Sequence, residues 1–421
     1  KGPLDAWGWY QDAGDWDSYV THLRVAQELL LAYEMAPGNF RDKELNIPES
    51  GNGLPDVLDE AAWLPRFCHR LRKELLAKQY GTGGIGLRIA GDAFGGDGEG
   101  KPSYLDVERT WAASGEDPES TMRYAGVAAH LAFALTLGPK PFKDPQGVDW
   151  TKEAKESYAW AVKNTRPGDE SAVKVLRIYA AAALFRLTGD KAYEDQLKRD
   201  TTDIKSDTLL WESANYGPAV YALSAGKAQR DPQLLDRLRA ALVHTATESG
   251  VTTPSKRALR WGGNYSFPML VGQQTTPWVL EVAVGAALTR ETDTVLSKQL
   301  RATLYTTCDY FLGEGPLNMV WITGVGPRSV QQIFHLDAWC NGKGRPHPGL
   351  IPYGPWRKEK DLGDGPWDQA WPHQTVYPSI DAWPGAERWF ENRNSPMSSE
   401  FTVHQNLGPA AAIYGLLCSD R

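Results

Sequence analysis

Apolar residues recur at intervals of three and four along most of the chain, which is the period of an amphipathic α-helix. The first such stretch runs from Ser18 to Met35, and the second begins at Pro55, a residue that suits the first position of a helix. Pro65 lies inside the second stretch and predicts a kink or a division there. Further helical patterns cover residues 119–138, 150–165, 170–189, 191–200, 206–227, 231–249, 264–273, 276–292, 293–312 and 403–418. Because no β-alternation of comparable length competes, the pattern predicts an all-α protein of about twelve helices.

Two long stretches lack this period. Residues 78–118 contain a glycine-rich tip at 91–100, and residues 313–402 contain 11 of the chain's 28 prolines and 7 of its 17 tryptophans. A loop as long as the second one is usually functional when it belongs to a compact chain, and this one is too aromatic to be disordered. We therefore expect 313–402 to form a folded surface feature over one end of a helical body.

Composition narrows the classes of function. With 421 residues, 42% of them hydrophobic, the chain can bury a large core. Its net charge of −7 and pI near 5.7 argue against a nucleic-acid partner, and no apolar run approaches the ~20 residues that span a bilayer. The four cysteines are scattered without a Cys-x-x-Cys pair, so the sequence offers no zinc pattern. We expect no nucleic-acid partner, no membrane span and no bound metal.

The first candidate catalytic residues lie in the aromatic stretch 8–19. Asp12 and Asp15 lie three residues apart in a turn kept small by Ala13 and Gly14, so both carboxylates could face one water or substrate atom. The flanking aromatic rings could stack on sugars. The alternative is a helix start, at which a carboxylate caps free N–H groups.

A second candidate is Glu400, which precedes Phe401 at the end of the long loop. Burial against aromatic rings would raise the pKa of its carboxyl group, as a general acid requires. A capping role at the following helix would lower that pKa instead, and the sequence leaves both possibilities open. A protonated acid that faces ionised aspartates is the arrangement of a glycosidase.

Several segments together resemble glycoside hydrolase family 9, and they occur in that family's order along nearly the whole chain. They are the Asp12-Ala13-Gly14-Asp15 turn, the passage 46–59, Asp309-Tyr310-Phe311-Leu312-Gly313, Pro316-Leu317-Asn318, Ile322-Thr323-Gly324-Val325-Gly326 and Ser399-Glu400. The resemblance implies one catalytic domain over 1–421 with an (α/α)6 barrel of six inner and six outer helices, which agrees with the twelve helical patterns. It also implies a secreted or periplasmic enzyme that hydrolyses β-1,4-linked glucans with inversion and endoglucanase action.

Roles are carried over by position. The resemblance implies that Asp15 is the general base, that Asp12 helps it to hold the attacking water, and that Glu400 is the general acid. His335 occupies the position of a substrate-binding histidine, and Trp261 that of a tryptophan that stacks on a sugar ring. For Trp261, a place in the core is an equal alternative.

The sequence departs from the family pattern at three points. Leu336 follows His335 where the family usually has arginine, so a substrate contact is lost or is supplied by Arg388 or Arg393. The Asp-Glu pair of the family's frequent calcium site is replaced by residues 175–176, Val-Leu, whose aliphatic side chains cannot bind a hard cation. The family's zinc cysteines have no counterparts, so we expect neither metal nor cofactor.

Two other functions remain open. The loops 78–118 and 341–381 could close one end of a cleft, which would suit an exo-acting β-glucosidase or β-glucosaminidase of the same fold. A carbohydrate-binding protein without catalysis is a further alternative, although all three carboxylates are present. The chain begins at Lys1 without methionine, which is compatible with removal of a leader or a preceding domain.

Overall fold

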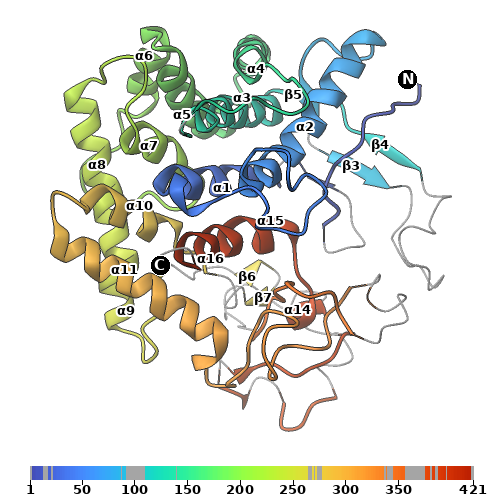
Figure 1. The fold of residues 1–421 in the computed structure, drawn as a ribbon, viewed down its shortest axis with the longest axis vertical. Helices are drawn as coiled ribbons and strands as arrows, with labels where there is room; N and C mark the ends of the chain where they lie inside the picture. The colour runs from blue at the N-terminus through green and yellow to red at the C-terminus, as the bar shows by residue number, and fades with distance from the viewer. Residues whose placement is uncertain are drawn as a thin grey trace.

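The structure is a computed structural model, and its main body is a ring of helices (Figure 1). It describes residues 2–12, 18–19, 22–86, 88–91, 110–138, 140–263, 268–269, 271–272, 277–335, 338, 345–355, 375–379, 382–384, 387–394 and 396–418. These residues contain eleven helices of eight residues or more and only short strands.

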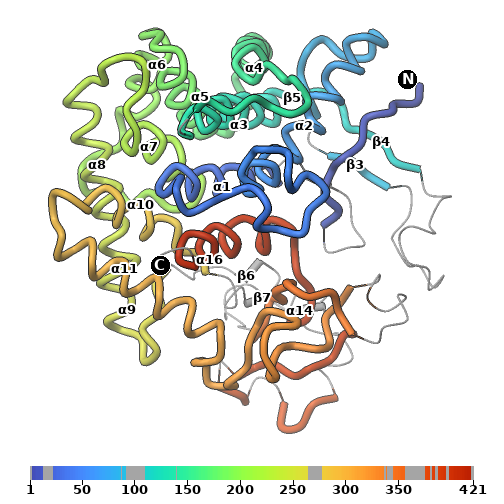
Figure 2. Tube along the Cα trace, viewed as in Figure 1, coloured from blue at the N-terminus to red at the C-terminus, as the bar shows by residue number. Residues whose placement is uncertain are grey.

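Six of these helices form an inner ring, and the first five of them are buried over most of their length. Each contacts the next one in chain order, and the last returns to the first, so that the two ends of the chain close the ring. Figure 2 shows the first and last helices of this ring running alongside each other. The inner helices are α1 (Leu23–Met35), α3 (Pro118–Ala134), α5 (Glu170–Thr188), α7 (Ser213–Leu223), α10 (Leu280–Thr289) and α16 (Ala411–Cys418).

Five helices with one apolar face pack around this ring, and each connects consecutive inner helices. They are α2 (Asp56–Ala77), α4 (Trp150–Asn164), α6 (Lys191–Asp200), α8 (Pro232–Thr247) and α11 (Thr294–Asp309). The predicted (α/α)6 barrel fold is confirmed, with all six inner helices and five of the six expected outer helices found among the described residues. Pro65 does not divide α2, which continues through it.

Local sequence explains where the outer helices begin. The side chains of Asp149, Asp190, Asp231 and Asp293 each accept a hydrogen bond from a backbone N–H in the first turn of α4, α6, α8 and α11. Such caps satisfy donors that have no partner within the helix. Gly189 ends α5 in the left-handed conformation, with φ of 79°. These boundaries are therefore set by residues next to them in the sequence.

Small residues allow the inner helices to approach closely. Residues Ala180–Ala183 of α5 are all fully buried. A Cβ atom on Gly126 of α3 would lie 2.3 Å from the Tyr179 ring of α5, so only glycine fits at this crossing. The contact fixes the spacing between α3 and α5.

A buried polar cluster joins four inner helices near their C-terminal ends. Glu34 of α1 forms a hydrogen bond with His130 of α3, at 2.9 Å, and an ion pair with Arg186 of α5. His130 also contacts the Tyr179 hydroxyl at 2.9 Å, and Arg186 donates to the Val220 carbonyl oxygen of α7. Burial by itself would raise the pKa of Glu34, but Arg186 and the hydrogen bond from His130 outweigh it and lower that pKa to about 2.

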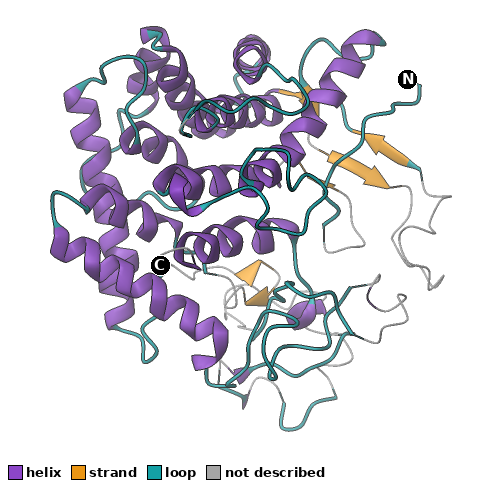
Figure 3. Ribbon diagram, in the orientation of Figure 1, coloured by secondary structure: helices purple, strands orange, loops and turns teal. Residues whose placement is uncertain are grey.

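The strands are confined to the side of the molecule where the long loops lie (Figure 3). β1 (Ser18–Tyr19), β3 (Arg88–Gly91) and β4 (Trp111–Ala113) form an antiparallel sheet in the order β1-β3-β4, in which Ser18 pairs with Ile89 and Ile89 with Ala113. β2 (Ile85–Gly86) pairs with β5 (Glu116–Asp117), and β6 (Pro268–Met269) with β7 (Val271–Gly272). The helix predicted over 264–273 is therefore wrong in its described residues, and Pro268, which lacks a backbone N–H, suits a strand end better than a helix interior.

The described part of the stretch 313–402 has a core of its own, as the sequence predicted. Its buried members include Trp321, Ile333, Ile351 and Trp389, and they pack with Phe311, two residues after the end of α11. Figure 1 shows these orange and red segments gathered below the helices. Short helical segments complete the described fold: η2 (Pro37–Asn39), η4 (Glu248–Thr252), α9 (Thr253–Ser255), η5 (Tyr310–Glu314), α14 (Pro396–Ser399), α15 (Val403–Gln405) and η9 (Asn406–Ala410). Among the described helices, none combines the length and the apolar character needed to cross a bilayer.

Candidate active site

The two halves of the predicted site meet where α1 and α15 begin. The backbone N–H of Val403, the first residue of α15, donates a hydrogen bond of 3.3 Å to Oδ1 of Asp12. These residues are 391 positions apart in the chain. A carboxylate at a helix N-terminus meets unpaired N–H groups and the positive end of the helix dipole, both of which favour its charged form. Asp12 is therefore held as an acceptor by Val403, a residue three positions after Glu400 in the sequence.

Asp15 lies in the segment 13–17, outside the described residues. Its role as general base and its separation from Glu400 stay predictions.

The backbone around Glu400 is fixed from two sides. The N–H of Phe334 donates to the Ser399 carbonyl oxygen at 2.8 Å, and the N–H of Tyr353 donates to the Glu400 carbonyl oxygen at 2.7 Å. A further bond joins Gly354 to Ser398. Phe401 is buried, whereas Glu400 itself is only partly buried. This clamp sets the position of Glu400 through segments more than 40 residues away in the sequence.

His335 lies next to this clamp. Its ring packs edge-on against Phe401, with 5.3 Å between ring centroids, and against His347, at 5.5 Å. The structure thus brings His335 beside the Glu400 segment, although its contact with a substrate stays a prediction. Of the two arginines expected to compensate for the change at 336, Arg388 is partly buried and donates to the Trp383 carbonyl oxygen, and Arg393 is exposed.

Trp261 is engaged by neighbouring protein groups. Its ring stacks on Tyr310, with centroids 4.5 Å apart, and the guanidinium group of Arg257 lies 4.7 Å from the ring centroid. Burial raises the pKa of Tyr310 to about 12, although Arg257 opposes this. These contacts favour the packing alternative for Trp261, and stacking on a sugar stays a prediction.

Trp9, three residues before Asp12, lines a cavity. Trp9 packs against Phe67 and Trp111, each at 5.6 Å between ring centroids. All three border a space of about 480 Å³ lined by the N-terminal segment, α2 and strands β3 and β4. Trp9 is therefore a wall of this cavity.

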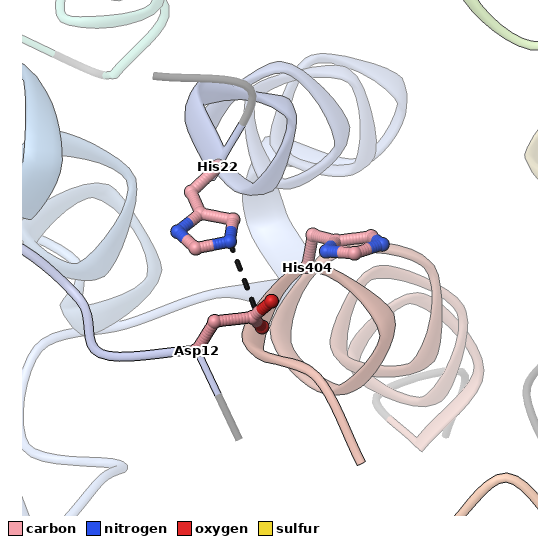
Figure 4. A group of neighbouring side chains, drawn as sticks. All are labelled: Asp12, His22 and His404. Atoms are coloured by element: carbon pink, nitrogen blue, oxygen red, sulfur yellow. Dashed lines mark ion pairs between the residues drawn. The ribbon is translucent and has the colours of Figure 1, made fainter. Parts of the chain in front are cut away.

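Two histidines beside Asp12 were missed by the sequence analysis. His22 immediately precedes α1 and is 1% exposed, and its Nε2 lies 3.6 Å from Oδ1 of Asp12. The ring of His404, from α15, stacks on that of His22 at 5.8 Å and 22°. Figure 4 shows the three side chains converging from separate segments. Neither histidine belongs to a sequence motif. The only hint that they lie at the site was their position in the sequence, because His22 directly precedes the first helix and His404 follows Glu400 by four residues.

Burial makes both imidazoles hard to protonate. It lowers the pKa of His22 to about 4, and burial together with His22 and Arg24 lowers the pKa of His404 to about 3. Both rings are therefore neutral near pH 7. Arg24 places a positive charge near these rings; its guanidinium lies over the Trp278 ring at 4.3 Å, and its Nε donates to Glu28 at 2.8 Å.

A partly buried glutamate of the inner helix α10 has a raised pKa. Burial raises the pKa of Glu281, on α10, to about 7, although a hydrogen bond from Ser249 opposes this. Glu281 is thus partly protonated near neutral pH, and no motif or spacing in the sequence singles it out.

A double ring of helices with an acidic, aromatic-lined end is the architecture of an (α/α)6 glycoside hydrolase. The chain belongs to glycosyl hydrolase family 9, because the profile of that family matches residues 1–413. Endoglucanase D of Acetivibrio thermocellus is 25% identical over 437 residues, covering 97% of this chain and 60% of that protein. The xyloglucan-specific endo-beta-1,4-glucanase of Bacteroides ovatus is 23% identical, with 83% and 60% covered. This chain therefore spans about three fifths of the length of these relatives.

Solved structures agree on the fold. A metagenome-derived family 9 endoglucanase superposes with a TM-score of 0.76 at 21% identity, over 100% of this chain and 72% of the other. A single mutant of a thermostable endoglucanase from Alicyclobacillus acidocaldarius gives 0.74 at 17% identity, over 99% and 76%. At these identities the likeness extends to the fold alone.

Proposed function

We propose that this protein hydrolyses internal β-1,4-glycosidic bonds of a glucan with inversion of configuration. The observation that carries the proposal is the hydrogen bond between Asp12 and Val403, because it joins the Asp-Ala-Gly-Asp segment to the Glu400 segment at one end of the inner ring. Membership of family 9 and the endoglucanase relatives support the choice of substrate.

In the proposed mechanism, each of three carboxyl groups has a separate catalytic role. Asp15 accepts a proton from the attacking water, and Asp12, held by the Val403 N–H, keeps that water in place. Glu400 protonates the departing sugar oxygen from the other side of the bond. An inverting enzyme needs room for the water, so we expect the carboxyl groups of Glu400 and Asp15 to be roughly 6.5–9.5 Å apart.

The surroundings suit these roles. The neutral rings of His22 and His404 add no positive charge beside Asp12, so that its carboxylate stays available to the water. The backbone clamp around Glu400 holds its Cα in place during the reaction. Such positioning contributes to the rate because the reacting groups need no reorganisation.

Two measurements on one substrate panel test the proposal. The panel contains a soluble cellulose derivative, xyloglucan, mixed-linkage glucan and cello-oligosaccharides. Internal cleavage predicts a rapid fall in viscosity with few new reducing ends, and proton NMR of fresh product should show the α-anomer first. Monosaccharide release from the start would instead establish exo action, β-anomeric product would contradict inversion, and binding without turnover would leave a carbohydrate-binding protein.

We further propose that residues 1–421 form one catalytic domain that acts outside the cytoplasm on a β-glucan partner. The closure of the ring by α1 and α16 supports one domain, and the polymeric substrate supports the location. Limited proteolysis should leave one core fragment that spans α1 to α16, and activity should be recovered from the culture medium or periplasm of the source cells.

A further inference from the structure

We propose that Asp12, His22 and His404 bind one transition-metal cation of the zinc type, and that the bound cation blocks hydrolysis. The binding site follows from the geometry of the three side chains alone. The inhibition rests in addition on the proposed function, because it assumes that Asp12 holds the attacking water.

The three side chains are close enough to share one ion. One ligand atom from each lies within 4.8 Å of the other two. Three such atoms always lie within about 2.8 Å of a common point, whereas zinc sits about 2.0–2.2 Å from nitrogen and oxygen ligands. Each ligand atom therefore has to move by less than about 1 Å to complete the coordination, and rotation of the side chains can supply this movement.

The site is also built to hold its ligands in place. The backbone N–H of Val403 donates to Asp12, and a metal-bound carboxylate is commonly oriented by such a hydrogen bond. His22 is almost fully buried directly before α1, and the His404 ring stacks on it, so packing limits the movement of both imidazoles. The view in Figure 4 shows the His22 ring directed at the Asp12 carboxylate, with His404 beside them.

The ligand set determines which cations fit. Two imidazole nitrogens and one carboxylate oxygen suit Zn²⁺, Co²⁺, Ni²⁺ or Cu²⁺, whereas Ca²⁺ and Mg²⁺ prefer oxygen ligands throughout. Three protein ligands leave at least one position open for water. Because the Asp12 side chain is 17% exposed, an ion can reach the site from solvent.

The proposed inhibition follows from competition for one carboxylate. A cation bound to Asp12 takes up the oxygen electron pairs that would otherwise hold the attacking water. Hydrolysis should therefore stop while the ion is bound and return when a chelator removes it.

Cobalt provides a direct binding test that does not depend on activity. The chelator-treated protein is titrated with Co²⁺, and we expect one equivalent to give the visible absorption bands of a site with four or five ligands. Zn²⁺ should remove these bands, and Ca²⁺ should not. Absence of the bands from the wild-type protein would overturn the proposal.

Two variants and a control assign the signal. His404→Gln and His22→Gln should each weaken Co²⁺ binding by at least about tenfold, because each removes one ligand. His244→Gln, on the outer helix α8, should leave the titration unchanged. Thermal unfolding checks that each variant is folded, and His404, which is less buried than His22, gives the safer substitution. Equal Co²⁺ binding by wild type and folded His404→Gln would place the ion elsewhere and refute the site.

A final measurement separates this proposal from the proposed function. Zn²⁺ should inhibit wild-type glucan hydrolysis reversibly, and whatever activity His404→Gln retains should need at least about tenfold more Zn²⁺ for half-inhibition. Normal hydrolysis that is unaffected by Zn²⁺ would refute the inhibition alone. Cobalt binding by a protein that hydrolyses no glucan even in its chelator-treated, metal-free form would refute the proposed function and leave the metal site standing.

Discussion

Removing the charge of Glu34 from its buried cluster should greatly lower the stability of the protein and change its activity little. Replacing Glu34 by glutamine keeps the shape of the side chain but removes its charge. Arg186, which is 2% exposed, would then be a buried cation without its counter-charge. Glu34 is twelve residues along α1 from His22, about 18 Å at the rise of an α-helix, so the active site should be unaffected.

Two arguments give the same magnitude. Removing one partner of a buried ion pair typically costs about 3–5 kcal/mol. The pKa of Glu34 falls from 4.5 to about 2 on folding, and at about 1.4 kcal/mol for each unit this corresponds to roughly 3–4 kcal/mol. We therefore expect Glu34→Gln to lower the free energy of unfolding by about 3 kcal/mol and the melting temperature by on the order of 5 °C.

The same shift predicts a dependence on pH. Because the pKa of Glu34 is lower in the folded protein, its contribution to stability is complete above pH 4.5 and is lost as the pH falls from there towards 2. The stability difference between wild type and Glu34→Gln should therefore shrink over this range. The other ionisable groups titrate in both proteins, so their contributions cancel in the difference between the two free energies of unfolding.

Urea denaturation followed by tryptophan fluorescence measures this difference at pH 7 and at several values down to pH 3. Glu291→Gln, at an exposed position between α10 and α11, is the matched control and should change stability by less than about 0.5 kcal/mol. A loss below 1 kcal/mol for Glu34→Gln, or a difference that stays constant with pH, would show that the Glu34–Arg186 pair is not a net stabilising interaction.

Three further predictions concern the site and the barrel. Asp15→Asn should lower glucan hydrolysis by at least ~10²–10⁴-fold in steady-state assays, with Asp12→Asn comparable or milder, and near-normal activity of Asp15→Asn would remove it as the base. Glu400→Gln should lose more activity on glucan than on an aryl glycoside with a good leaving group, whereas an equal loss on both would point to a different acid. Gly126→Ala should cost about 1–3 kcal/mol in denaturation experiments, because the added methyl group would overlap the Tyr179 ring; unchanged stability would mean that the two helices can move apart.

The sequence alone was enough to predict the helices and their order, because the information is local. A period near 3.6, aspartates at the starts of outer helices and Gly189 at the end of α5 each act on residues within one turn of themselves. Where the local signal was weak, the prediction was wrong. The helix expected from residue 206 begins only at Ser213, and the one expected over 264–273 is replaced, where described, by β6 and β7.

Only the tertiary structure decided what surrounds Asp12. His22 and His404 are 382 positions apart, and neither belongs to a motif, so no pattern in the sequence pairs them with each other or with Asp12. The same holds for the Tyr310 ring on Trp261 and for the clamp around Glu400. Closing the ring of inner helices brings the first and last of them together, and the site forms where they meet. Which side chains touch there depends on packing over the whole chain, whereas the helices themselves depend on a few neighbouring residues.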